Sequence, residues 1–117
     1  MTRKESPIAC QMNALTIEER SRQAKLFAEL THVVQRVQEL PDGIAVEFSS
    51  KADIWMSAAE FITLERRCCP FLSFSMEIKG EDGPMWLRIT GREGVREFLA
   101  AELRFSTDSE GRRKPKA

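Results

Sequence analysis

The chain has 117 residues, of which 42% are hydrophobic and 31% are charged, as expected of one globular domain with its own core. Lysine and arginine together number 18, and so do aspartate and glutamate, so the formal net charge is zero. Without a positive excess, the composition gives no general attraction to nucleic acid or to an anionic membrane surface. The apolar runs are also shorter than the roughly 20 residues that a membrane-spanning helix needs.

The N-terminal part predicts a loose leader over residues 1–12, which contains Cys10, followed by a helix. The leader lacks the apolar region of a signal peptide, and three cysteines are a poor count for a disulfide framework, so we expect a cytoplasmic protein with reduced thiols. Thr16 and Glu19 have the spacing of a capping box, in which each side chain bonds the backbone amide of the other residue. Apolar residues then recur at helical spacing, which predicts an amphipathic helix over residues 17–31.

The next stretch predicts a β-hairpin. Residues 33–40 are rich in β-branched side chains and predict a strand. In the turn that follows, Pro41 presets its own backbone and Gly43 is free to take a positive φ. Apolar and other residues alternate over 44–48, which predicts the partner strand.

A second helix and a second hairpin follow. The helix is predicted over residues 54–68 and ends before Pro70, because the residue that precedes a proline is pushed out of the helical region. Alternating apolar residues then predict strands over 72–78 and 85–89. The capping-box spacing returns at residues 90–93 and predicts the start of a third helix.

These elements predict an α+β fold. The order is an N-terminal helix and then two β-β-α units, and two hairpins most simply pair into one four-stranded antiparallel sheet with the helices on one face. A single domain is expected over residues 1–105. Residues 106–117 are polar and contain a basic cluster, so we expect them to form a disordered basic tail.

Cys68 and Cys69 lie where the second helix is predicted to end. Because Pro70 forces Cys69 toward an extended conformation, both thiols can face the same region. A disulfide between the two is disfavoured, since consecutive α-carbons lie about 3.8 Å apart and disulfides usually need roughly 4.4–6.8 Å. The junction therefore predicts two neighbouring unpaired thiols.

Glu65 lies one helical turn before Cys68, near the centre of the apolar face of the predicted helix. A carboxylate in such a place must be paired, be hydrogen-bonded, or have its pKa raised by desolvation. One explanation is a buried pair with a strand arginine such as Arg88. The other explanation is a role beside the thiols, as a metal ligand or as a proton acceptor.

Two segments carry a resemblance: residues 65–74, E-R-R-C-C-P-F-L-S-F, and residues 83–91, G-P-M-W-L-R-I-T-G. In these segments the chain resembles an uncharacterised family of small bacterial proteins that share an E-R-x-C-C-P-F-L-x-F core. That family also tends to have a cysteine before an Ala-Leu-Thr helix start, which here is Cys10 ahead of residues 14–16. The resemblance covers roughly residues 10–103. It implies no particular activity, and it directs attention to all three cysteines.

We therefore predict that the protein binds a thiophilic metal or metalloid ion through Cys10, Cys68, Cys69 and Glu65. If Cys10 packs beside the pair, three thiolates suit Hg(II), As(III), Cu(I), or Zn(II) with a fourth ligand. Glu65 or His32, the one histidine, could be that fourth ligand. His32 equally fits the C-terminal end of the first helix, where the helix dipole favours a cation.

Two other functions stay open. In a thiol redox protein or sensor, Cys68 or Cys69 is the nucleophile and Cys10 is the resolving thiol. In an interaction module the cysteines only pack, and Trp55 and Trp86 mark the surface for a homodimer or a protein partner. The sequence has no phosphate loop, catalytic triad or nucleic-acid-binding motif. It therefore favours a protein that is not an enzyme and that binds neither nucleic acid nor membrane.

Overall fold

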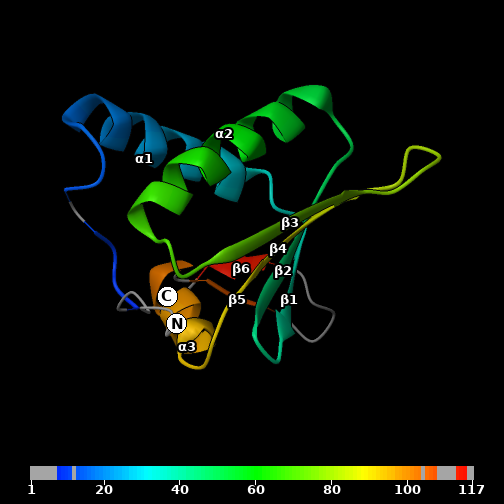
Figure 1. Cartoon of the computed structure of the whole chain (residues 1–117). Helices are drawn as coiled ribbons and strands as arrows, with labels where there is room; N and C mark the ends of the chain where they lie inside the picture. The colour runs from blue at the N-terminus through cyan, green and yellow to red at the C-terminus, as the bar shows by residue number, and fades with distance from the viewer. Residues whose placement is uncertain (1–7, 12, 104, 108–112, 116–117) are drawn as a thin grey trace, which may run out of the picture.

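The structure, a computed structural model, describes residues 8–11, 13–103, 105–107 and 113–115. Its main elements follow the predicted order, a helix and then two β-β-α units (Figure 1). Within the described residues, no helix has both the length and the apolar character to cross a membrane. The elements are α1 (Ile17–His32), β1 (Arg36–Leu40), β2 (Gly43–Phe48), α2 (Ala52–Cys68), β3 (Ser73–Ile78), β4 (Met85–Thr90) and α3 (Val95–Leu103).

The two hairpins pair into one antiparallel sheet with the strand order β1-β2-β4-β3. β2 and β4 form the centre of the sheet, where Val46 lies opposite Leu87. Along β4, Leu87 and Ile89 are buried on one face, whereas Trp86 and Arg88 alternate with them on the other and are partly exposed. The predicted α+β class and its four-stranded antiparallel sheet are confirmed.

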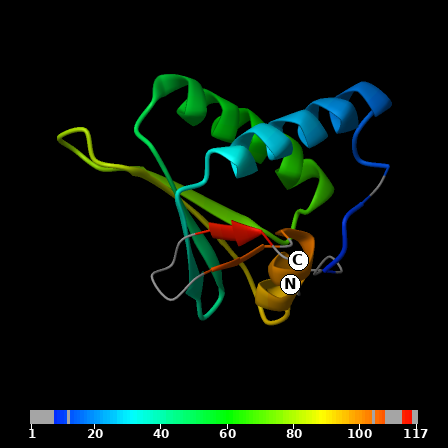
Figure 2. The same cartoon turned by 180° about the vertical axis from the view of Figure 1, so that it is seen from behind.

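The helices cover the apolar face of the sheet. α1 and α2 lie side by side across it, and α3 packs against β2 (Figures 1 and 2). One hydrophobic core fills the space between the helices and the sheet. The largest of its fully buried side chains are Leu26 of α1, Met85 of β4, Val95 of α3 and Cys69 at the end of α2. One cysteine of the Cys-Cys pair is thus part of the core.

β1 begins three residues later than the β-branched run predicts. α1 continues to His32, and Val33 caps it with a backbone N–H that donates to the Leu30 carbonyl at 3.1 Å. The chain needs the following residues to turn from the helix into the sheet, so the strand starts at Arg36. Tertiary packing of α1 thus overrides the β propensity of Val33 and Val34.

α3 also begins later than predicted. Residues 90–93 have the spacing of a capping box, but the helix starts only at Val95, after Gly94 has adopted a φ of 98°. This left-handed conformation separates Glu93 from the first helical turn. At the C-terminal end, β5 (Phe105–Thr107) and β6 (Arg113–Pro115) pair as a short antiparallel ribbon, which overlaps the tail predicted over residues 106–117. Residues 1–7 and 12 of the predicted leader, and residues 108–112 and 116–117 of the predicted tail, lie outside the described residues.

The predicted capping box at the start of α1 is present, and its removal should weaken the fold. Thr16 Oγ1 accepts the Glu19 backbone N–H at 3.1 Å, and Glu19 Oε1 accepts the Thr16 N–H at 2.9 Å. We expect Thr16→Ala to lower the free energy of unfolding by about 0.5–2 kcal/mol, measured by urea denaturation. Thr31→Ala near the other end of α1 is the control. An equal loss in both variants would contradict a specific role of the cap.

Candidate metal centre

The site begins where α2 ends. Cys68 is the last residue of α2, and Cys69 has left the helix with φ −127° and ψ 72°, as the proline that follows it requires. The Cys69 N–H still donates to the Glu65 carbonyl at 2.6 Å, so the exit from the helix is tight. The two sulfur atoms lie 3.7 Å apart. The prediction that both thiols face the same region is confirmed.

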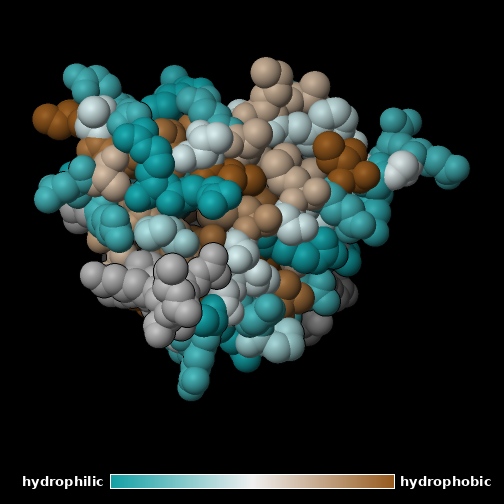
Figure 3. Space-filling model, viewed as in Figure 1, coloured by the Kyte–Doolittle hydropathy of each residue, from teal (hydrophilic) through white to brown (hydrophobic). Residues whose placement is uncertain are grey.

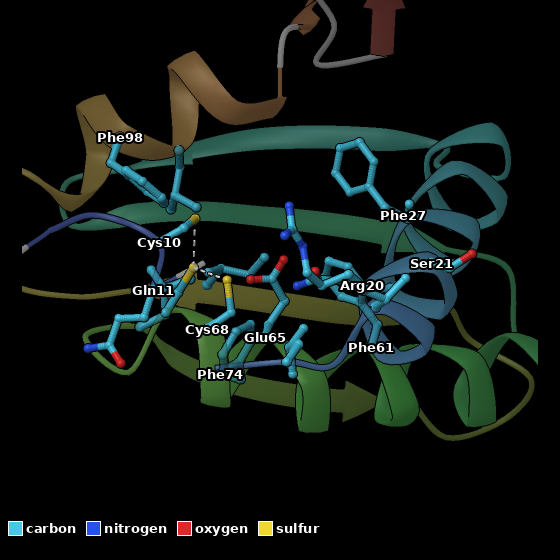
Figure 4. A pocket seen from close by; sticks show the side chains of 18 residues that line it. Cys10, Gln11, Arg20, Ser21, Phe27, Phe61, Glu65, Cys68, Phe74 and Phe98 are labelled. Atoms are coloured by element: carbon cyan, nitrogen blue, oxygen red, sulfur yellow. Dashed lines mark hydrogen bonds between the residues drawn. The ribbon is translucent and has the colours of Figure 1, made fainter. Parts of the chain in front are cut away.

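The N-terminal segment brings the third thiol to this end of α2. The Gln11 backbone N–H donates to the Cys68 carbonyl at 2.8 Å, and Arg67 Nη2 donates to the Ala14 carbonyl at 2.9 Å. Arg67 also forms an ion pair with Glu19 in the first turn of α1. These contacts hold Gln11, Ala14 and Glu19 against α2. Cys10 Sγ consequently lies 3.3 Å from Cys69 Sγ, as one of the dashed lines in Figure 4 shows.

The three sulfur atoms form a compact cluster, in which all lie within 4.8 Å of one another. Ligand sulfurs that surround a tetrahedral Zn²⁺ at 2.3 Å are separated by about 3.8 Å. Cys69 Sγ lies 3.3 Å from Cys10 Sγ and 3.7 Å from Cys68 Sγ, distances close to this value, so small side-chain shifts would complete a common coordination sphere. No disulfide joins these cysteines. The cluster therefore has the ligand type and spacing of a thiolate metal site.

Burial controls the protonation of the cluster. Burial raises the pKa of the Cys69 thiol far above its ordinary value, and the hydrogen bond with Cys10 and the negative charge of Glu65 act in the same direction. Cys69 is therefore a neutral thiol at physiological pH in the absence of an ion. An ion that binds must displace this proton, as is general for thiolate metal sites. The same raised pKa disfavours the reactive thiolate that a redox nucleophile requires.

The raised pKa also couples folding to pH. The folded protein holds the Cys69 proton more tightly than the unfolded chain does, so this thiol stabilises the fold below its ordinary pKa of 9.0, and the contribution is lost as the pH rises above that value. We expect the free energy of unfolding of the reduced, ion-free protein to decrease at alkaline pH, and Cys69→Ala to weaken this decrease. Urea denaturation as a function of pH measures both. If the free energy of unfolding falls equally with rising pH in the wild-type protein and in Cys69→Ala, the thiol of Cys69 does not couple folding to pH.

Glu65 lies beside the thiols but does not join the sulfur cluster. Its side chain is partly buried and points into the same cavity as Cys68 (Figure 4). Arg88, the strand arginine suggested as its partner, lies on the other face of the sheet, where Nη1 is 3.3 Å from Glu77 Oε1. That pairing is wrong, because the sheet separates the two side chains. A role of Glu65 as a fourth ligand stays a prediction.

His32 and the tryptophans lie elsewhere. His32 is the last residue of α1 and lines a separate hollow with Asp53, at the helix end that the dipole argument predicts. Trp86 alternates with the buried Met85 and Leu87 along β4 and therefore lies on the sheet face away from the core. Trp55 is partly buried, and it is Met56 that is 74% exposed. Apolar surface gathers over this N-terminal half of α2 (Figure 3). A partner surface there stays a prediction.

A cavity of about 550 Å³ opens beside the thiols. α1 and α2 line one side and α3 lines another, with β3 and β4 contributing between them (Figure 4). The sequence analysis missed this cavity because its lining comes from separate elements and has no common motif. All three cysteines and Glu65 line it, together with side chains that the sequence did not single out for function: Arg20, Phe27, Phe61, Phe74, Ile89 and Phe98.

Comparison of the chain with models of protein families, with curated proteins and with solved structures finds no match. The resemblance to small bacterial proteins with the E-R-x-C-C-P-F-L-x-F core accordingly stays a proposal based on residues 65–74 and 83–91. The site itself is a cluster of three cysteine thiols in a largely apolar environment.

Proposed function

We propose that the protein binds a thiophilic metal or metalloid ion through Cys10, Cys68 and Cys69. The observation that carries this proposal is the meeting of three reduced thiols from two distant segments within 4.8 Å. Soft thiolate ligands select ions such as Hg(II), As(III), Cu(I) and Zn(II). A buried cysteine can also serve only as a small apolar side chain, but core packing alone does not require three of them to converge.

The charge of the complex favours As(III) among these ions. Three thiolates carry three negative charges, so As(III) gives a neutral complex, whereas Hg(II), Zn(II) and Cu(I) leave a net negative charge. A net charge is costly in this site, because Cys68 and Cys69 are only 8% and 1% exposed. Zn(II) would also need a fourth ligand, for which Glu65 is the candidate in the same cavity.

Titration of the reduced protein tests the proposal. Each ion is added under anaerobic conditions, and the retained ions are counted by mass spectrometry of the native protein. We expect one As(III) per chain, bound with loss of three protons. An As(III) held by two thiols keeps a hydroxyl group and is heavier by one water molecule, so the two binding modes are distinguishable. If no ion is retained at micromolar concentration, the proposal fails.

The backbone contact that holds Cys10 in place gives a test that leaves all three thiols intact. Gln11→Pro removes the N–H that donates to the Cys68 carbonyl and also restricts the backbone of Cys10. We expect the affinity for As(III) to fall by about tenfold or more, equivalent to the loss of one hydrogen bond. Competition with a soluble dithiol measures the affinity. Gln11→Ala retains the N–H and should bind as the wild-type protein does; an equal loss in both variants would contradict the role of the backbone contact.

A redox function is the second candidate. The distance of 3.3 Å between Cys10 Sγ and Cys69 Sγ favours it, since oxidation could join these two atoms with little movement. The raised pKa of Cys69 opposes it. Alkylation with iodoacetamide separates the two functions. Reaction of a site thiol faster than free cysteine at neutral pH would favour the redox function, and slow reaction would favour ion binding.

A further inference from the structure

We propose that the site also accepts a thiophilic ion that carries one organic substituent, which two of the three sulfurs bind, and that the cavity beside the thiols holds this substituent. The ligand class is a monosubstituted thiophilic species, such as an aryl As(III) compound. This inference rests on the proposed ion-binding function and adds the part of the ligand that the sulfurs do not contact. It follows from three properties of the cavity: its position, its lining and its size.

The first property is position. Cys68 and Cys69 are nearly inaccessible from bulk solvent, with exposures of 8% and 1%, yet both of them and Cys10 line the cavity. Figure 4 shows Cys10 and Cys68 at one end of the cavity, with Glu65 pointing into it from α2. An ion bound by these sulfurs therefore directs any further substituent into this space rather than into the packed core.

The second property is the lining. Four aromatic side chains contribute to it, one each from α1, α2, β3 and α3: Phe27, Phe61, Phe74 and Phe98. Two charged side chains, Arg20 and Glu65, also point into the cavity (Figure 4). Ligand sites of proteins typically combine a mainly apolar, aromatic lining with a few polar groups that orient the ligand. An ion without an organic group would not contact these aromatic side chains.

The third property is size. A cavity of about 550 Å³ is far larger than one ion and lies in the range of small-molecule sites, roughly 300–1,000 Å³. An apolar cavity of about 150 Å³ already binds benzene. The space beside the thiols is therefore sufficient for an aryl group with room for a polar substituent near Arg20.

The binding step balances without an oxidant or a reductant. An aryl As(III) oxide reacts with two thiols: two arsenic–sulfur bonds form, both arsenic–oxygen bonds break, and the oxygen leaves as water with the two thiol protons. Arsenic stays in the +3 state. Cys10 and Cys69, whose sulfurs are 3.3 Å apart, are the natural pair for this reaction, and the aryl group then occupies the third position on arsenic.

Two probes that form the same two arsenic–sulfur bonds isolate the contribution of the cavity. Phenylarsine oxide and its methyl analogue differ only in the organic group. Their affinities for the reduced protein are measured by competition with dithiothreitol, which also corrects for the intrinsic preference of a dithiol that has no cavity. We expect the protein to bind the phenyl compound about ten- to hundredfold more tightly than the methyl compound, because the phenyl group is buried.

A pair of tryptophan variants tests the location. Ala24 lines the cavity from α1, so Ala24→Trp should fill part of it and remove most of the preference for phenyl while arsenite binding is retained. Ala59 is exposed on α2 and does not line the cavity, so Ala59→Trp should keep the preference. Phe74→Ala, which removes part of the aromatic lining, should also reduce it. Thermal unfolding checks that each variant is folded.

The outcomes separate the inference from the proposed function. Arsenite bound with no preference for phenyl over methyl would overturn the organic substituent and leave ion binding intact. A preference that persists unchanged in both Ala24→Trp and Phe74→Ala would place the phenyl group outside this cavity and also overturn the inference. If neither arsenite nor either organic compound binds, the proposed function fails and this inference fails with it.

Discussion

Replacing Cys69 with alanine is expected to lower the affinity for As(III) by at least about a hundredfold. Structural thiolate and imidazole zinc sites bind with roughly 10–16 kcal/mol from four ligands, which corresponds to about 3 kcal/mol for each ligand. Cys69 is central to the cluster, because its sulfur is the one that lies 3.3 Å from Cys10 and 3.7 Å from Cys68. Its loss therefore leaves the two remaining sulfurs without their common neighbour. Competition with a soluble dithiol measures the change.

The control must separate loss of a ligand from loss of packing, because Cys69 is also part of the core. Val46 is buried in the centre of the sheet and does not line the cavity. Val46→Ala removes apolar volume from the same core and should lower the stability while the ion affinity stays unchanged. Cys10→Ala and Cys68→Ala should each weaken binding as well. Full As(III) affinity in any of the three cysteine variants would reduce the site to two thiols.

Replacing Gly43 with alanine is expected to give the largest loss of stability from a single added methyl group. An alanine Cβ at this position would lie 2.0 Å from the Ile89 carbonyl oxygen and 2.8 Å from Thr90 Cα. Both atoms belong to the backbone of β4, so no side chain can move away. We expect the free energy of unfolding to fall by at least about 2 kcal/mol, the range of overpacked cores, and the melting temperature by about 8–16 °C.

Gly80 in the loop between β3 and β4 is the matched control, since a Cβ there would meet no atom within 4 Å. Gly80→Ala should change the free energy of unfolding by less than about 0.5 kcal/mol. Thermal and urea denaturation of both variants measure the difference. Equal stability of the two variants would show that β2 can move away from β4, which would contradict the close approach at the start of β2.

Gly43 also shows what a local sequence pattern can and cannot predict. The turn after Pro41 was correctly predicted, but the reason for the glycine was expected to be a positive φ. In the described residues the one glycine with a positive φ is Gly94, and Gly43 is required instead by the backbone of β4. That backbone is more than 40 residues away in the sequence, so no local pattern contains it.

The fold was predictable because its signals are local and mutually consistent. Alternating apolar residues identify β2 and β4 as strands, and the capping box at Thr16 identifies the start of α1. The Cys-Cys-Pro sequence likewise predicts the end of α2, because proline acts on the residue directly before it. Strand alternation, helix capping and the effect of proline each depend on residues that are close together in the sequence, so a local pattern reveals them.

The complete site was only partly predictable. The sequence shows that Cys68 and Cys69 are adjacent, but it cannot show that Cys10 reaches them, since that approach depends on a hydrogen bond between two backbone groups. Backbone donors and acceptors are the same at almost every residue and have no sequence signature. The cavity was not predicted for a related reason. Its aromatic lining comes from four elements that meet only in the folded protein.

X-ray absorption at the arsenic edge of the reduced protein loaded with one equivalent of arsenite tests the central claim most directly, because it counts the atoms bound to the ion. The sulfur cluster of Cys10, Cys68 and Cys69 predicts a first shell of three sulfurs and no oxygen. After Cys10→Ala, we expect two sulfurs and one oxygen. A first shell of two sulfurs and one oxygen in the wild-type protein, unchanged by Cys10→Ala, would contradict a three-thiol site.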